Sequence, residues 1–447
     1  MRRVVHVARE TVRAAFRSRL VVSLCVLLAL VLSVLPCAVG GSGTFEEARR
    51  LALTWSLGLS TIILSAATLW SGCSAISGER EERTWASVSV TPASTFAVWA
   101  GKWAGLVALD ALLLALVIAG AALQLRLRGG RGERLQPFER IAPAPASLHA
   151  NAERYCAAAL ESGAIPADSG HTKEEWTEHI YHDLLSSPMA LSSGNFFFWD
   201  FPLPSYASDE PLPGRAYASL TLVSPFGTAS DIAGSLEILL PDGTVCATRP
   251  IAPGDERELR IGIPEETLAA RPGTLRLRFR HTGASGTPAA LFHPAEDAAL
   301  FLPHSTFAGH LVRIGLVLLA MLSTLAAIGV ACGSLFSRPV AIFAATGLVL
   351  LGLLSHSDLN DEGVGSCDDP VAAASPGHAY AVRARKVLDG IATLTGPIAD
   401  AAPLDRAGDG LLVPTRPVAL SLLQNGLGLP LLLGLGTSAL LRRREDE

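Results

Sequence analysis

Residues 103–125 read WAGLVALDALLLALVIAGAALQL, and this stretch decides the fold because Asp110 is its only charged residue. An α-helix rises about 1.5 Å per residue, so about 20 apolar residues are needed to cross the roughly 30 Å hydrocarbon core of a bilayer. The stretch is long enough and apolar enough for that purpose. We therefore predict a transmembrane helix here.

Similar apolar runs lie on both sides of this helix, in residues 20–39, 51–78, 314–337, 339–355 and 417–441. The whole chain of 447 residues is 49% hydrophobic and 17% charged, with a mean hydropathy of +0.37. These runs predict an α-helical integral membrane protein with about six transmembrane helices. The run 339–355 is short, and a re-entrant segment is an alternative there.

The distribution of basic residues gives the helices a direction. The first 19 residues carry Arg2, Arg3, Arg9, Arg13, Arg17 and Arg19 against the single acid Glu10. The positive-inside rule places this end in the cytoplasm, as an amphipathic helix over 1–19. Counting through six spans brings the basic tail from Arg442 to the cytoplasm as well. We expect a multi-pass protein of the cytoplasmic (inner) membrane, and a cleaved signal peptide is the alternative for the first run.

Residues 126–308 then form an inserted domain outside the cytoplasm. Its first part, 147–187, has helical patterning, with Ser147 as a candidate helix cap. From about residue 195 apolar and polar residues alternate, as in 274–280, TLRLRFR, and Pro and Gly mark the turns. We predict an α+β domain with a β-sandwich. A second outer segment, 356–416, is acidic and then helical over 380–394.

Three features of the inserted domain leave alternatives open. Cys156 and Cys246 could pair if the domain faces an oxidising compartment. A set of four residues at helical spacing could form a zinc site or simply a solvated helix face. The set is His171, Glu175, His179 and His182. The aromatic run 196–199, FFFW, could hold a lipid or peptide, and a core strand explains it equally well.

The sequence gives no indication of an enzyme. It contains neither G-x-x-x-x-G-K-[ST], which would cradle nucleotide phosphates, nor G-x-S-x-G. We expect no catalytic residues, no cofactor and no bound metal. The formal net charge of −5 argues against nucleic acid as a partner.

Asp110 is the intramembrane polar residue of interest. An acid at the centre of a spanning helix costs about 2.5–3.5 kcal/mol on insertion scales, so it should face the helix bundle or a partner. The alternative is that Asp110 lies close enough to the inner interface to stay hydrated.

The segment 77–102 between the second and third spans is the most informative loop. It begins with charged residues and has a break at Pro92. These features predict a short helix on the inner face of the membrane that docks a cytoplasmic partner. A plain solvated loop is the alternative.

Three short motifs lie in and beside this segment: residues 76–84, ISGEREERT, residues 91–94, TPAS, and residues 101–105, GKWAG. They resemble the I-S-x-E-R-E-x-G-T segment, the T-P-x-S turn and the G-K-x-x-G motif of the type-2, exporter-like class of ABC transporter permeases. Arg83 stands where that family usually has glycine. The last span also runs directly into a basic tail, as in the family. The resemblance covers roughly 1–125 and 309–447.

The resemblance implies a homodimer or heterodimer of permease chains that acts in export and is bound to separate ATP-binding subunits. It also implies which residues couple the chain to the ATPase. They are Glu79, Arg80, Glu81, Glu82, Arg83, Thr84, Pro92 and Lys102. Two alternatives stay open: a membrane-anchored sensor or scaffold, and a mechanical transducer that acts through the domain outside the cytoplasm.

Overall fold

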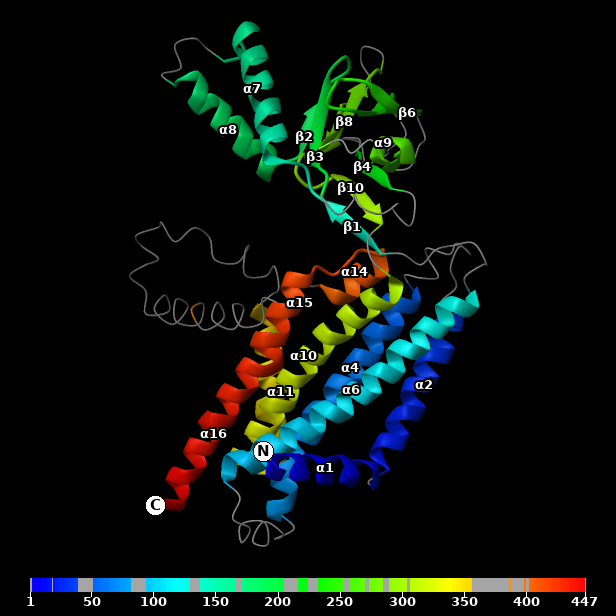
Figure 1. Cartoon of the computed structure of the whole chain (residues 1–447). Helices are drawn as coiled ribbons and strands as arrows, with labels where there is room; N and C mark the ends of the chain where they lie inside the picture. Colours follow the sequence, from blue (N-terminus) through cyan, green and yellow to red (C-terminus); the bar gives the residue numbers. More distant parts are fainter. Residues whose placement is uncertain are drawn as a thin grey trace. The chain divides into compact units, whose positions relative to one another are not determined.

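The structure is a computed structural model that divides into two compact units. Unit 1 comprises Met1–Glu133 and Phe307–Glu447, and unit 2 comprises Arg134–Thr306 (Figure 1). The described residues are 2–17, 19–38, 51–81, 94–128, 137–165, 171–204, 216–223, 232–252, 257–269, 273–283, 289–303, 306–355, 386, 398 and 402–446.

The regular elements in the described part of unit 1 are all helices. Its elements are α1 (Arg2–Arg17), α2 (Leu20–Ala38), η1 (Leu51–Ser56), α4 (Leu57–Glu81), α6 (Thr95–Arg128), α10 (Phe307–Leu335), α11 (Arg338–Ser355), α14 (Pro403–Asp409), α15 (Thr415–Ser421), η4 (Leu422–Gly428) and α16 (Leu429–Asp446). Most of the predicted helix 380–394 lies outside the described residues.

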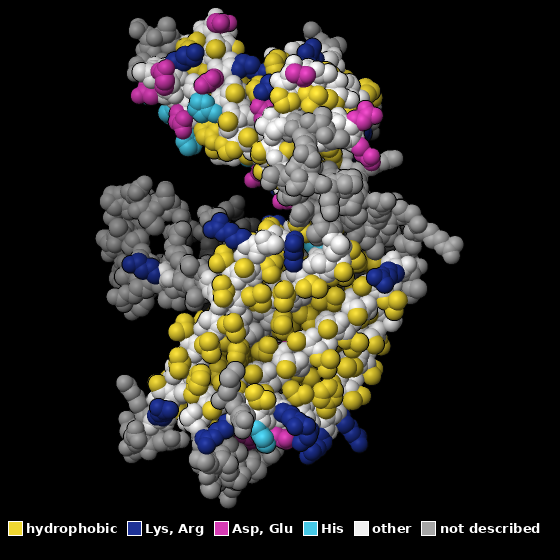
Figure 2. All heavy atoms as spheres, in the orientation of Figure 1, with side chains coloured by type: hydrophobic (Ala, Val, Ile, Leu, Met, Phe, Trp, Pro, Cys, Tyr) yellow, Lys and Arg dark blue, Asp and Glu magenta, His cyan; other side chains and the backbone are white. Residues whose placement is uncertain are grey.

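Four of these helical stretches are long and apolar enough to cross a membrane. They are Leu53–Glu79, Thr95–Arg126, Phe307–Leu335 and Thr415–Arg442. The pair Arg3–Arg17 and Val21–Val34, bent by 67°, gives a fifth stretch if it is counted as one span, and Arg338–Gly352 is a shorter apolar helix. The visible face of unit 1 is covered with apolar side chains (Figure 2). Soluble proteins rarely expose so large an apolar surface, so this unit is compatible with a membrane protein.

Helix α10 forms the centre of unit 1. Of the 18 most apolar consecutive residues in α10, 78% are buried inside the protein, whereas the corresponding share is 28–39% in the other three stretches. Helix α10 packs closely on α4. A Cβ atom added to Gly72 on α4 would lie 3.0 Å from the Cα of Gly329 on α10. A Cβ atom added to Gly333 on α10 would lie only 2.9 Å from the carbonyl carbon of Cys73 on α4. Small residues four apart let helix backbones approach in this way.

Unit 2 contains ten strands in its described residues. They are β1 (Phe138–Ile141), β2 (Met189–Leu191), β3 (Phe196–Pro202), β4 (Tyr217–Thr221), β5 (Gly234–Leu239), β6 (Val245–Ile251), β7 (Glu258–Gly262), β8 (Thr274–His281), β9 (Ala290–Phe292) and β10 (Ala298–Pro303). One four-stranded sheet has the order β1-β10-β4-β7 and another β3-β8-β5-β6, while β2 pairs with β9. Every pairing is antiparallel.

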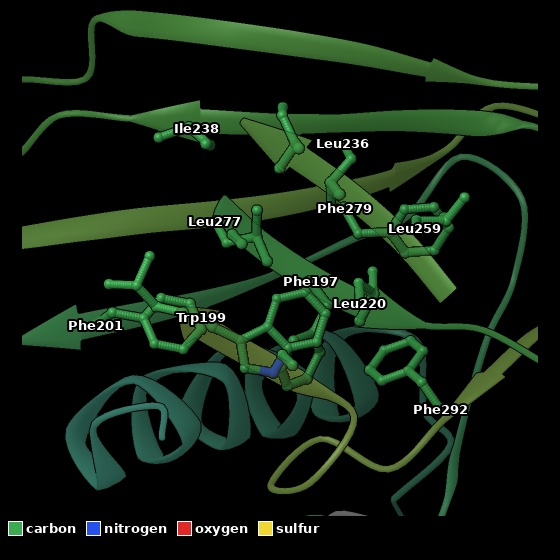
Figure 3. Packing of buried hydrophobic residues seen from close by; sticks show 14 of the residues in the cluster. Phe197, Trp199, Phe201, Leu220, Leu236, Ile238, Leu259, Leu277, Phe279 and Phe292 are labelled. Atoms are coloured by element: carbon green, nitrogen blue, oxygen red, sulfur yellow. The ribbon is translucent and has the colours of Figure 1, made fainter. Parts of the chain in front are cut away.

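Both four-stranded sheets contribute to one apolar core (Figure 3). Trp199 on β3, Phe279 on β8 and Leu220 on β4 are all fully buried in it. The indole of Trp199 also donates a hydrogen bond of 2.8 Å to the carbonyl oxygen of Pro294, which satisfies its only polar atom. This core gives unit 2 its own source of stability.

The alternation predicted for 274–280 is confirmed, because β8 alternates between less and more buried residues along its length. It pairs with β3, whose Phe197, Trp199 and Phe201 point into the core. Phe196 and Phe198 lie on the other face, where the guanidinium of Arg154 stands 4.0 Å from the Phe196 ring centroid. The aromatic run 196–199 is therefore a core strand with two arginine-covered rings.

Helices α7 (Pro145–Glu161) and α8 (Lys173–Ser186) account for the helical part of unit 2. The predicted cap at Ser147 is wrong: Ala144 is the N-cap and Pro145 occupies the first turn, where its missing N–H costs nothing. Helix α8 begins with a capping box between Thr172 and Glu175. Helix α7 also covers the edge of β3, since Asn151 donates a hydrogen bond of 2.7 Å to the carbonyl of Phe198.

Candidate functional site

The candidate site is the junction between the end of α4 and the start of α6. The sequence placed a loop over 77–102, but α4 continues to Glu81 and α6 already begins at Thr95. The boundary differs because packing of the first turns of α6, not apolarity alone, keeps 95–102 helical. Glu82, Arg83, Thr84 and Pro92 lie outside the described residues, as does the side chain of Arg80.

A partly buried ion pair joins the two helices at this junction. Lys102 Nζ lies 2.6 Å from Glu79 Oε1, and it also donates a hydrogen bond to the backbone carbonyl of Ala75. The Lys102 side chain is only 8% exposed, whereas that of Glu79 is 34% exposed. Lys102 therefore fixes α6 to α4 within the chain. Of the side chains of this group that the structure describes, those of Glu79, Glu81 and Lys102, Glu81 is the exposed one.

Helix α1 packs closely against α6 at two glycines near Lys102, Gly101 and Gly105. A Cβ on Gly101 would lie 2.6 Å from the Cβ of Val7, and a Cβ on Gly105 would lie 2.8 Å from the Cβ of Thr11. Only glycine permits this approach of α1 to α6. The four-residue spacing of the two glycines was the signal for this contact, and the sequence interpretation did not use it.

Two tryptophans connect the start of α6 to two further helices. Trp99 is buried and packs against α16, where a Cβ on Gly434 would overlap its ring. The indole of Trp103 donates a hydrogen bond of 3.2 Å to the carbonyl of Ser323 on α10. The start of α6 is thus held by α1, α4, α10 and α16 together, and a displacement of this junction would move several helices.

Asp110 lies deeper in the bundle. It is fifteen residues after the first residue of α6 and eighteen before the last. Its residue is 5% exposed, and Thr68 Oγ1 on α4 donates a hydrogen bond of 2.7 Å to Asp110 Oδ1. Asp110 faces the bundle, as the cost of a lipid-facing charge requires.

The last apolar stretch contains the π-helical segment η4, which packs on α10. Ser323 Oγ donates 2.8 Å to the carbonyl of Gly426, and Thr324 Oγ1 donates 2.7 Å to that of Asn425. The wider π turn changes the usual pattern of backbone hydrogen bonds, and hydroxyls of α10 bind two of its carbonyls. This contact fixes the last helix to the centre of unit 1.

The open alternatives in unit 2 have plain outcomes. His171 Nδ1 lies 3.4 Å from Glu175 Oε2, but His182 contacts Glu178 instead. No group of three or more metal-ligating side chains is arranged around a common point in the described part of the chain. Cys156 and Cys246 are both free thiols, so they do not pair.

Glu175 also has a local role at the start of α8. Its carboxylate accepts a hydrogen bond of 2.8 Å from the backbone N–H of Thr172. This hydrogen bond lowers the pKa of Glu175 below its ordinary value, with His171 adding to the effect. The residue is therefore part of the helix cap.

Comparisons with models of protein families, with curated proteins and with solved structures found no match to this chain.

Proposed function

We propose that this chain is the membrane-spanning permease subunit of an ABC transporter of the type-2 class, acting in export with ATP hydrolysed by a separate subunit. The observation that carries the proposal is the Glu79–Lys102 ion pair on either side of residues 82–93. The family-like sequence 76–84 leads into this segment and 101–105 follows it. A partner bound there would act on both α4 and α6.

The packing of the junction supports a mechanical role. A force on segment 82–93 would displace α4 at Glu81 and α6 at Thr95, because the segment joins these two helices. The close contacts at glycines would then displace α1, α10 and α16 as well. Packed helices transmit such displacements because their interfaces deform little. Closure of two ATPase subunits would tilt the helices in a dimer of permease chains and open a path across the bilayer.

The proposal includes six spans in the inner membrane, with α2 and α11 added to the four long stretches. Both termini are then cytoplasmic, and unit 2 lies outside as a β-sandwich with two helices. Labelling of the native Cys246, a partly exposed free thiol in unit 2, tests directly whether unit 2 lies outside the cytoplasm. A membrane-impermeant maleimide should label Cys246 in intact cells, and label appearing only after permeabilisation would contradict the orientation.

The test of the ATPase coupling uses charge reversal at the junction. The tagged full-length chain should co-purify from its own membranes with a separate protein that carries the G-x-x-x-x-G-K-[ST] sequence. Glu81→Lys with Glu82→Lys should remove most of that protein. The matched control is Glu265→Lys with Glu266→Lys, two adjacent exposed acids on α9 (Glu265–Ala269) in unit 2. Equal recovery with both double variants would refute the coupling role.

A mechanical transducer is the second candidate, because unit 2 is a compact unit with its own core. In that case ATP energy moves unit 2 and no substrate crosses the membrane. Deletion of residues 134–306 separates the two functions. Transport that persists without unit 2 would argue against the transducer, and loss of all function with ATPase binding intact would favour it. A sensor or scaffold would bind no ATPase at all.

A further inference from the structure

The carboxyl group of Asp110 is only half partnered. Thr68 Oγ1 donates to Oδ1 at 2.7 Å, whereas Oδ2 is buried and has no hydrogen-bond partner among the described residues. Asp110 is 5% exposed and Thr68 is 3% exposed. The coupling role of the α4–α6 junction makes no use of this group.

The described chain provides no positive charge for this carboxylate. Lys102 is the nearest basic residue along α6, but eight residues of helix separate the two by about 12 Å. Its ammonium group is already bound to Glu79 and to the carbonyl of Ala75. An ionised carboxylate left alone in a buried site costs several kcal/mol, so Asp110 either takes up a proton or pairs with a positively charged ligand.

We propose that Asp110 and Thr68 bind a positively charged ligand, either a monovalent inorganic cation or the ammonium group of a small organic cation. Asp110 Oδ2 supplies the negative charge. Thr68 Oγ1 donates its proton to Oδ1 and keeps its lone pairs for the ligand. A single carboxylate matches a single positive charge, which favours a monovalent ligand over a divalent metal ion.

Three further hydroxyls on the same helical segment extend the polar surface. Ser56, Ser60 and Thr61 are buried, and none of their oxygens has a partner in the described residues. Buried helix hydroxyls commonly bond to a carbonyl one turn earlier, as Ser77 does with Cys73 at 2.6 Å. Thr61 lies seven residues from Thr68, about 10 Å away on the same side of the helix. These hydroxyls add buried polar atoms between Thr68 and the start of α4.

This inference does not rest on the proposed function, because cation binding is a property of the chain alone. If no ATPase binds the chain, cation binding at Asp110 is still expected. If no cation binds, the proposed coupling to an ATPase is unaffected.

The experiment measures the thermal unfolding of the purified full-length chain in detergent as Na⁺, K⁺ or tetramethylammonium is added at constant ionic strength. A ligand that binds the folded state raises the unfolding temperature. We expect at least one of the three to do so. The cation that acts identifies the source, inorganic or organic. Asp110→Asn should abolish the shift, and Thr68→Val should weaken the apparent affinity about tenfold.

Asp405→Asn, a change of an exposed acid on α14, is the matched control and should keep the shift. An equal shift in Asp110→Asn, or no shift with any of the three cations, would overturn the proposal.

A second measurement needs no variant. Dicyclohexylcarbodiimide adds to a carboxylic acid in apolar surroundings and rearranges to an N-acylurea, with no other reactant. Mass mapping should find this adduct on Asp110, and the effective cation should slow its formation. Labelling at an unchanged rate in the presence of that cation would overturn the proposal even if Asp110→Asn failed to fold.

Discussion

At the scale of single residues, Lys102 shows how one contact changes the interpretation of a motif. The sequence grouped it with the residues that meet an ATPase, whereas the structure buries it against Glu79. The two are 23 positions apart and meet only because α4 and α6 are antiparallel neighbours. No local pattern contains that information, so the pairing could not be predicted from the sequence. Glu81 keeps the exposure that a partner contact requires.

Lys102→Met should destabilise unit 1 by about 1–2 kcal/mol. The figure is below the usual cost of breaking a buried pair because Glu79 retains access to water. Thermal unfolding in detergent measures the change. Arg13→Gln is the control, since the Arg13–Glu10 pair is about half exposed and should contribute little. Equal losses in the two variants would mean that burial of Lys102 is not the source of the effect.

The capping box of α8 predicts a dependence on pH. The pKa of Glu175 is lowered in the folded state, mainly by the backbone N–H of Thr172. The stabilisation is therefore present above the ordinary Glu pKa of about 4.3 and is lost as the pH falls through the lower, folded-state pKa.

Thr172→Ala should destabilise α8 by about 1 kcal/mol and speed amide exchange in its first turn. Glu175→Gln should remove the acid-dependent part of the exchange while leaving the Thr172 cap in place. Exchange that is unaffected by Thr172→Ala would contradict the capping box.

At the scale of elements, the positions of the apolar helices and of the alternating strands could be predicted from the sequence. A helix that spans a membrane needs a long apolar run, and a strand on a sheet core alternates between apolar and polar residues. The prediction failed at the start of α6, where Thr95 to Lys102 are less apolar. Tertiary contacts hold those turns in place: Val7 on Gly101 and Trp99 on Gly434. The glycine contact between α4 and α10 was also missed, although Gly329 and Gly333 have the required spacing.

Gly333→Ala should destabilise unit 1 by about 1–3 kcal/mol, because the new Cβ would overlap backbone atoms of Cys73 on α4. Gly347→Ala on α11 is the matched control: a Cβ there meets nothing within 4 Å. The control should be neutral or slightly stabilising, since alanine favours a helix. Thermal unfolding of both variants in the same detergent decides, and a neutral Gly333→Ala would contradict the close contact of α4 with α10.

At the scale of the whole molecule, the chain consists of a helical unit and a separate β-containing unit. The sequence placed the boundaries at about 126 and 308, and the units divide at 133–134 and 306–307. A fragment of residues 134–306 should therefore fold alone, because both of its sheets share one core. Circular dichroism with a cooperative thermal transition would show this. A fragment that stays unfolded in water would mean that unit 2 depends on unit 1.

The central claim is that the end of α4 meets a separate ATPase. Site-specific photo-crosslinking tests it most directly, with the photoreactive amino acid at Glu81 in the full-length chain in its own membranes. We expect a crosslink from position 81 to a protein that carries G-x-x-x-x-G-K-[ST], and none from the same probe at Asp405. No crosslink to such a protein from position 81, or equal crosslinking from both positions, would contradict the account.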